Sequence, residues 1–224
     1  MAPALIFDLD GTLVDTAPDL LAALNHALAL EGRPPLKPDN LRQLVGRGAR
    51  VLIAQAFKTA IGPTDPEIAE RMLKTFLVFY RDHIADRSRP WPGVVETLEA
   101  LKAQGARMGV LTNKPHDLSV LLLEKLKLDG YFASVYGQGR APYMKPDPRI
   151  FADVVRDCGA AGGLMIGDSE TDVETARAAG ASVILASYGY TTVPARELGA
   201  DAVVDHFSDI PAAIARLLGG ERER

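Results

Sequence analysis

The sequence has one cysteine, no excess of basic residues and no long hydrophobic run. The single cysteine, Cys158, excludes an intramolecular disulfide and is typical of a protein in a reducing compartment. We interpret Cys158 as a small buried hydrophobe rather than as a nucleophile. The formal net charge of −4 lacks the basic excess of proteins that bind a phosphate backbone, so we expect no nucleic acid partner.

The hydrophobic stretches are too short for a membrane span or a secretion signal. No segment approaches the roughly 18 uncharged apolar residues that a transmembrane helix needs. The first apolar run, Ala4 to Phe7, ends at Asp8 and follows no basic segment. We therefore expect a cytoplasmic protein with no membrane partner, and either a monomer or a homodimer is compatible with the sequence.

The composition is that of an ordinary globular protein, with 47% hydrophobic and 24% charged residues over 224 positions. From Thr16 to about Asp86, apolar residues recur only at helical spacing. The segment Thr16-Ala17-Pro18-Asp19 predicts a capping box at the start of the first helix. The periodic positions are Leu20, Leu21, Leu24 and Leu28, then Val51, Leu52, Gln55 and Ala56, then Met72, Leu73, Phe76, Leu77 and Tyr80.

After a linker-like stretch at residues 89–93, predicted strands and helices alternate. This alternation predicts an α/β fold, a doubly wound parallel sheet with a Rossmann-like core and a small inserted all-helical cap domain. The core would comprise residues 1–15 and 91–224 and the cap residues 16–90, with hinges near Thr16 and Trp91. Besides the first strand, the predicted strands are 107–111, 164–166, 182–185 and 202–204, and the helices are 94–104, 117–127, 149–158, 172–179 and 209–218.

Two carboxylates and a glycine follow the first predicted strand. In an extended backbone, residues two apart project to the same side, so Asp8 and Asp10 can face one pocket. Gly11 then gives the chain the freedom to turn sharply. Two like charges this close need a shared cation or a proton on one of them, and both arrangements serve catalysis.

Three later segments repeat the pattern of a strand followed by polar residues. They are Gly109 to Asn113, the loop containing Lys145-Pro146-Asp147, and Leu164 to Asp172. Because parallel strands end at the same edge of a sheet, all four segments should converge on one crevice. Carboxylates, a hydroxyl and an ammonium gathered there suit metal-assisted transfer of a phosphoryl group, and Mg²⁺ prefers such oxygen ligands.

In this order the four segments resemble the four motifs of the haloacid-dehalogenase-like superfamily, and the inserted helices resemble its small helical cap. The resemblance covers essentially the whole chain. Residues 45–50 (Val-Gly-Arg-Gly-Ala-Arg) and 187–190 (Ser-Tyr-Gly-Tyr) are most similar to the phosphoglycolate phosphatase branch. By resemblance, the aspartate at position 10 indicates phosphatases and phosphomutases rather than dehalogenases, phosphonate hydrolases or ion-pumping ATPases.

The resemblance implies a role for each matched residue. Asp8 would be the nucleophile that forms an aspartyl-phosphate, and Asp10 would act as acid and then as base. Thr112 would hydrogen-bond a phosphoryl oxygen, Asn113 would help to orient the substrate, and Lys145 would offset the charge of the transferred group.

The resemblance also implies a metal site. Mg²⁺ would bind Asp8, Asp168 and the main-chain carbonyl of Asp10. Asp172 and Ser169 fit a capping box, so they could hold the helix that positions Asp168 or serve as a support around the metal site.

Several of these residues have simpler interpretations. Thr112 and Asn113 could end a strand and cap a helix, and Lys145 could be a solvated loop lysine. In the cap, Arg47 and Gly48 could bind a substrate carboxylate, because arginine offers a planar fork and glycine permits close approach. The same stretch could instead be a glycine turn with solvated arginines.

The predicted function is a Mg²⁺-dependent phosphatase that hydrolyses a small phosphorylated metabolite, with 2-phosphoglycolate as the first choice of substrate. N-acetylmuramate 6-phosphate is a competing substrate, because the core motifs do not contact the leaving group. A β-phosphoglucomutase-like isomerase would use the same nucleophile but return the phosphoryl group to a sugar. A phosphate sensor without catalysis would not need Asp10.

Overall fold

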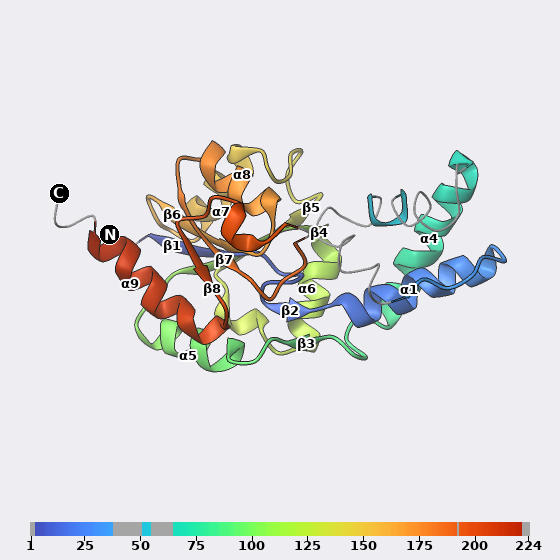
Figure 1. Ribbon diagram of the computed structural model, residues 1–224, viewed down its shortest axis with the longest axis horizontal. Helices are drawn as coiled ribbons and strands as arrows, with labels where there is room; N and C mark the ends of the chain where they lie inside the picture. Colours follow the sequence, from blue (N-terminus) through green and yellow to red (C-terminus); the bar gives the residue numbers. More distant parts are fainter. Residues whose placement is uncertain (1–2, 38–50, 55–64, 192, 221–224) are drawn as a thin grey trace.

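The computed structural model describes residues 3–37, 51–54, 65–191 and 193–220 (Figure 1). Its strands are β1 (Ala4–Phe7), β2 (Val14–Asp15), β3 (Arg89–Pro90), β4 (Met108–Pro115), β5 (Ser134–Gln138), β6 (Gly163–Gly167), β7 (Ser182–Ala186) and β8 (Ala202–Val204). Its α-helices are α1 (Ala17–Leu30), α4 (Pro66–Asp82), α5 (Val94–Ala103), α6 (His116–Lys125), α7 (Pro148–Asp157), α8 (Glu170–Ala178) and α9 (Ile210–Gly220). Short 3₁₀ turns occupy Asp129–Tyr131, Ala195–Glu197 and Phe207–Asp209.

Six strands form one parallel sheet in the order β5-β4-β1-β6-β7-β8. The chain proceeds outward from β1 through β4 to β5 and then crosses back to β6, so the winding direction reverses beside β1. This confirms the predicted doubly wound sheet, and ligands of such sheets bind at the carboxyl ends of the strands beside the reversal.

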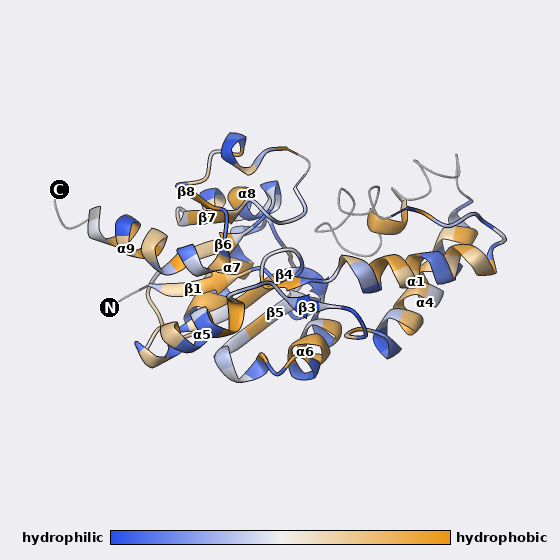
Figure 2. Ribbon diagram, turned by 60° about the horizontal axis from the view of Figure 1, so that its bottom comes forward, coloured by the Kyte–Doolittle hydropathy of each residue, from blue (hydrophilic) through white to orange (hydrophobic). Residues whose placement is uncertain are grey.

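Helices cover both faces of the sheet, and β1 is buried between them. Leu5 and Phe7 lie in one apolar cluster with residues of α5, α6 and α9, whereas Ala4 and Ile6 lie in a second with residues of α7 and α8. Successive side chains of a strand point to opposite faces, so four consecutive apolar residues serve both clusters. In Figure 2 the covering helices carry both hydrophobic and hydrophilic residues, as amphipathic helices do.

The predicted boundaries of α5 to α9 agree with those of the structure within two residues. Strand β5 is not among the predicted strands, and β4 ends later than predicted. No strand was expected at residues 134–138. This sequence, Ser-Val-Tyr-Gly-Gln, has few apolar residues, and β5 is a partly exposed edge strand. β4 runs four residues beyond its predicted end, and its register with β5 shifts between Leu111 and Pro115.

The inserted helices α1 and α4 pack side by side away from the sheet in both views (Figures 1 and 2). Most of their periodic apolar residues are buried, among them Leu24, Leu28, Met72 and Phe76, whereas Leu21 and Leu77 are partly buried. Of the middle group, Leu52 is buried in a helical turn, while Gln55 and Ala56 lie outside the described residues. No helix that the structure describes is both long and apolar enough to cross a membrane.

The predicted capping box at Thr16 is wrong. Within the described chain the Thr16 side chain makes no capping bond, and its hydroxyl is buried without a partner. The Asp19 carboxylate instead accepts hydrogen bonds from the Arg87 amide, the Ser88 amide and the Ser88 hydroxyl, at 2.7–3.0 Å. Asp19 is buried, and donors from the returning connection satisfy it better than its own helix end could.

The two connections between sheet and inserted helices also pair with each other. β2 and β3 form a short antiparallel ribbon that joins Val14 to Pro90 and Asp15 to Arg89. The residues expected to be a simple linker are therefore hydrogen-bonded to the outgoing chain. Cys158, in contrast, behaves as expected: it lies buried in the second cluster, and burial raises the pKa of its thiol to about 11.

Candidate active site

The polar segments converge at the carboxyl edge of three neighbouring strands. Asp8 follows β1, Thr112 and Asn113 lie near the end of β4, and Asp168 follows β6. All four of these side chains are at most 5% exposed. The carboxyl ends of β4, β1 and β6 thus bring together residues from three distant parts of the chain, as the parallel sheet predicted.

Asp8 is held by its own turn and by the lysine loop. Its main-chain amide continues the pairing with β6 by donating to the Ile166 carbonyl at 2.8 Å. Its Oδ1 accepts a hydrogen bond from the Leu9 amide at 2.7 Å, and its Oδ2 lies 3.0 Å from Lys145 Nζ. The carboxylate is therefore fixed at both oxygens in a buried position, which suits a nucleophile that must meet its target at one angle.

Lys145 is a buried member of the site and not a solvated loop lysine. Its Nζ lies 2.6 Å from Asp172 Oδ1 in addition to its contact with Asp8, and Asn113 Nδ2 donates to its main-chain oxygen at 3.2 Å. Burial favours the neutral amine, but the carboxylates of Asp172 and Asp8 outweigh it and raise the pKa of Lys145 above its usual value. Lys145 is thus a fixed positive charge beside Asp8.

Asp172 makes the capping-box contacts predicted for it and also contacts Lys145. Its Oδ2 accepts hydrogen bonds from the Asp168 amide, the Ser169 amide and the Ser169 hydroxyl, which completes the predicted capping box at the start of α8. Its Oδ1 faces Lys145. One carboxylate therefore ties the lysine loop to the turn that carries Asp168.

Asp168 sits in a space that two glycines make. Its Oδ1 accepts from the Thr12 hydroxyl at 2.9 Å and its Oδ2 from the Tyr190 amide at 2.7 Å. A Cβ on Gly189 would lie 2.2 Å from Asp168 Cβ, and one on Gly11, whose φ is +89°, would lie 2.4 Å from Asp168 Oδ2. Both positions require glycine, because any larger side chain would displace the carboxylate.

Three carboxylates crowd together in the described part of this site. Asp8, Asp168 and Asp172 each place an oxygen within 4.8 Å of the others, and all three are buried. Burial raises the pKa of Asp8 to about 7 although Lys145 opposes the shift, and burial followed by repulsion from Asp172 and Asp8 raises that of Asp168. Such a cluster fits a divalent cation, which would offset the excess negative charge.

Asp8 and Asp168 fit that cation better than Asp172 does. Both Asp172 oxygens are already committed, one to Lys145 and the other to the capping box. The Asp10 carboxylate is not one of the three clustered side chains. The predicted ligand at that position is its main-chain carbonyl, and this assignment stays a prediction.

The raised pKa of Asp8 predicts how metal-free protein responds to pH. Asp8 binds a proton more tightly in the folded chain than in the unfolded one, so between about pH 4 and 7 the folded state holds more protons. Its contribution to stability therefore falls as the pH rises through this range. We expect the melting temperature in a chelator to fall from pH 5 to pH 8 in the parent protein, and to fall less in Asp8→Asn. An equal decline in both proteins would contradict the assignment.

Asp10 has a partner that sequence reasoning missed. Lys114 Nζ lies 3.1 and 3.3 Å from the two Asp10 carboxylate oxygens and 2.7 Å from the Tyr80 hydroxyl of α4. Lys114 is 4% exposed and Asp10 is half-buried. A lysine directly after the Thr112-Asn113 pair was the available signal, but it lies beyond the predicted end of the strand.

Tyr190 connects the acidic cluster to the start of the inserted helices. Its amide holds Asp168, while its hydroxyl donates to Asp15 at 2.6 Å and accepts from the amides of Thr16 and Ala17. The hydroxyl thus satisfies helix-end donors that the Thr16 side chain leaves open. Asp15 therefore holds the Tyr190 hydroxyl at this turn.

Removing the Tyr190 hydroxyl should weaken the fold but spare the cation site. In Tyr190→Phe, buried donors and Asp15 lose their partner, and we expect the free energy of unfolding to fall by roughly 1–3 kcal/mol. Divalent cation affinity should change little, because Asp168 is held by the main chain of Tyr190. Denaturant unfolding and a cation titration measure the two effects. Weaker cation binding at unchanged stability would contradict this division.

Of the other residues predicted for the site, Thr112 and Asn113 are described by the structure and Arg47 and Gly48 are not. The Thr112 hydroxyl accepts from the Lys114 amide at 3.3 Å, and Asn113 Oδ1 is buried with no partner among the described residues. This acceptor is open to a hydrogen-bond donor on a ligand. Arg47 and Gly48 lie outside the residues that the structure describes.

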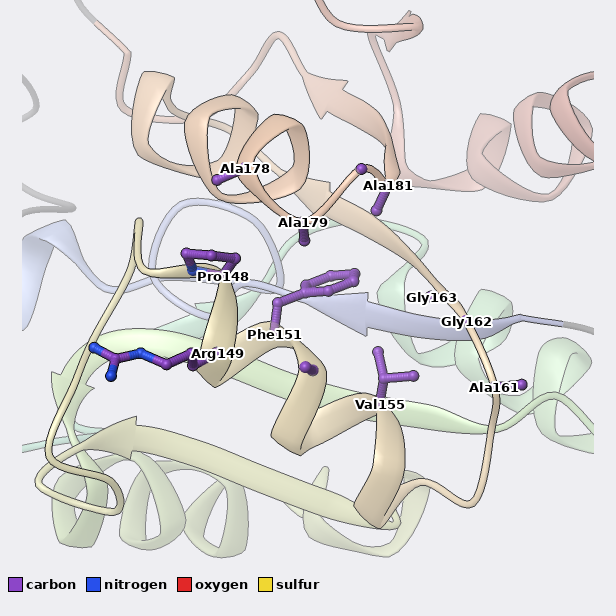
Figure 3. A pocket seen from close by; sticks show the side chains of 12 residues that line it. Pro148, Arg149, Phe151, Val155, Ala161, Gly162, Gly163, Ala178, Ala179 and Ala181 are labelled. Carbon is purple, nitrogen blue, oxygen red and sulfur yellow. The ribbon is translucent and has the colours of Figure 1, made fainter.

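A second hollow lies away from these carboxylates. A cavity of about 590 Å³ lies beside α7 and the turn after α8. Figure 3 shows residues that line it, among them Phe151, Val155, Gly163 and Ala179. Gly163 begins β6, so this cavity lies at the amino end of that strand, away from Asp168. The described residues that line this cavity include no carboxylate.

Comparison with known proteins agrees with the geometry. Residues 5–186 match the family model described as haloacid dehalogenase-like hydrolase. A phosphoglycolate phosphatase of Caulobacter vibrioides is 48% identical, covering 95% of this chain and 90% of its own, and one of Mesorhizobium japonicum is 41% identical over 96% of both.

A solved structure gives the same result. The crystal structure of a predicted phosphoglycolate phosphatase from Haemophilus somnus superposes with a TM-score of 0.87 at 32% identity, covering 94% of this chain and 97% of its own. The chain therefore belongs to the haloacid dehalogenase-like hydrolases, in the branch that resembles phosphoglycolate phosphatases.

Proposed function

We propose that this protein is a Mg²⁺-dependent phosphatase that hydrolyses 2-phosphoglycolate through an aspartyl-phosphate, and that it works in the cytoplasm as a monomer or homodimer. The observation that carries the proposal is the Asp8 carboxylate, buried beside Lys145 at the carboxyl edge of the sheet, with Asp10 two residues on. The substrate comes from the relatives named phosphoglycolate phosphatase.

In the first step, an Asp8 oxygen would attack phosphorus while the bond from phosphorus to the leaving oxygen breaks. Asp10 would give a proton to that oxygen, so the product leaves as an alcohol. In the second step Asp10 would take a proton from water, the water oxygen would bond to phosphorus, and the bond to Asp8 would break. This splits one displacement into two and releases inorganic phosphate.

Charge and hydrogen bonding would stabilise both steps. The Lys145 ammonium lies beside Asp8 and would offset charge on the transferred group. The Thr112 hydroxyl would donate to a phosphoryl oxygen, and Asn113 would help to orient the substrate. Asp8, Asp168 and the Asp10 main-chain carbonyl would hold Mg²⁺. When bound, the ion would neutralise phosphoryl and carboxylate charge.

The domain division expected from the sequence is part of this proposal. Residues 1–15 and 91–224 would form the catalytic core and residues 16–90 a cap that closes over the site. The paired connections β2 and β3, with Asp19 bound to the returning chain, would form the hinge. Arg47 and Gly48 would contribute to substrate binding from the cap.

A turnover screen with purified protein tests the function. With Mg²⁺, 2-phosphoglycolate should give the highest kcat/KM in a panel that includes N-acetylmuramate 6-phosphate and sugar phosphates, with one phosphate released per substrate consumed. A chelator should abolish turnover, and added Mg²⁺ should restore it. Sugar phosphate interconversion without phosphate release would instead identify a mutase.

A further inference from the structure

Two lysine side chains are buried in the described part of the site, and they have different partners. Lys145 Nζ contacts two carboxylates, those of Asp8 and Asp172. Lys114 Nζ contacts one carboxylate, that of Asp10, and the neutral hydroxyl of Tyr80. The Lys114 side chain is 3% exposed, so these two partners take the place of solvent around its ammonium group.

The two ammonium groups also lie on different sides of the reaction proposed above. Lys145 touches Asp8, the residue that would bond to phosphorus. Lys114 touches Asp10, the residue that would protonate the oxygen of the leaving group. In that reaction Lys114 would therefore lie next to the leaving group, and Lys145 would lie next to the phosphoryl group.

The contact of Lys114 with both oxygens of Asp10 competes with the role proposed for Asp10 as the acid. If the Asp10 carboxyl turned away from Lys114 toward the leaving oxygen, Lys114 would keep only the Tyr80 hydroxyl, which carries no charge. A buried ammonium without an anionic partner is costly. A second anion, carried by the substrate, would remove that cost.

We propose that Lys114 is a binding site for a carboxylate on the leaving group. The substrate carboxylate replaces that of Asp10 on the Lys114 ammonium and releases Asp10 to act as acid. The site therefore selects phosphoesters of short hydroxy acids, in which a carboxylate stands one or two carbons from the ester oxygen. This inference rests on the proposed phosphatase function and assigns its specificity to a core residue.

Two features of the structure fix the ammonium for this task. Lys114 lies in β4 where the register with β5 shifts, and such irregularities redirect side chains next to active sites. Tyr80 is 1% exposed and stacks on Phe76 within α4, so the hydroxyl that orients Lys114 comes from a packed position on an inserted helix. The carboxylate site would thus be shared by the core and this helix.

A pair of substrates tests the assignment. 2-Phosphoglycolate and 2-hydroxyethyl phosphate share the phosphoester, but only the first has a carboxylate. The ratio of their kcat/KM values should fall roughly 10- to 100-fold in Lys114→Met, the range expected for one lost charge-assisted hydrogen bond. Lys114→Arg keeps a positive charge and should recover much of the ratio. The control Lys102→Met removes an exposed lysine of α5 and should leave the ratio unchanged.

The ratio separates the possible outcomes. An equal loss on both substrates in Lys114→Met would overturn the inference, because it would show that Lys114 acts only through Asp10. Failure of the unmodified protein to hydrolyse either substrate would instead refute the proposed function. If Lys114→Met is too slow to assay, calorimetric binding of both compounds to Asp8→Asn, with and without Lys114→Met, gives the same ratio. Unchanged relative binding there would also overturn the inference.

Discussion

Replacing Asp8 by asparagine is expected to reduce phosphate release from 2-phosphoglycolate by at least roughly 10⁴-fold, in line with the loss of a covalent nucleophile in other enzymes. The amide has the shape of the carboxylate and can still accept the Leu9 hydrogen bond. It lacks the negative oxygen that would bond to phosphorus. Steady-state phosphate release with saturating Mg²⁺ measures the loss.

The same variant should remain folded, which separates chemistry from stability. Asp8 is one of three clustered buried carboxylates, so its neutral replacement removes repulsion from Asp168 and Asp172. We expect an unfolding midpoint in a chelator that equals or exceeds that of the parent protein at pH 8. Turnover within tenfold of the parent rate would contradict the role of Asp8.

Asp10→Asn should lower kcat for 2-phosphoglycolate by roughly 10²- to 10⁴-fold, the range for removal of a general acid or base. Asparagine can neither protonate the leaving oxygen nor accept a proton from water. The first role is dispensable for an aryl phosphate such as p-nitrophenyl phosphate, because nitrophenolate leaves without a proton. With that substrate the variant should release one equivalent of nitrophenolate rapidly and then nearly stop.

Substrate binding and a surface control complete the Asp10 experiment. Affinity for 2-phosphoglycolate should be retained in Asp10→Asn, because the Lys145 and Lys114 charges remain. Asp82→Asn, at the exposed end of α4, should have the kinetics of the parent protein. Steady turnover of the aryl phosphate by Asp10→Asn without a burst would exclude Asp10 as the base of the second step.

The sequence alone predicted the convergence of the site because a parallel sheet enforces it. Once β1, β4 and β6 were recognised as strands, their carboxyl ends had to share one edge, and Asp8, Thr112 and Asp168 with them. The capping box of Ser169 and Asp172 was also local enough to predict. Helix boundaries in the core followed from apolar periodicity, which burial against the sheet enforces.

The contacts that the sequence did not predict join distant segments. Tyr190 binds the chain 174 positions away at Thr16, and Asp19 binds Ser88 across the inserted helices. Lys114 meets Asp10 across 104 positions. No spacing rule links such pairs, because the tertiary fold alone brings them together. In addition, nothing in the sequence around a lysine distinguishes a buried lysine from a solvated one.

The most direct test of the proposed chemistry is to locate the phosphoryl group. Asp10→Asn protein would be mixed with p-nitrophenyl phosphate and Mg²⁺, quenched in acid after the burst, and analysed by peptide mass spectrometry. A phosphoryl group on the Asp8 side chain, absent when Asp8 is also replaced by asparagine, is the predicted result. Phosphorylation of another residue, or a burst with no phosphorylated peptide, would contradict a mechanism that proceeds through Asp8.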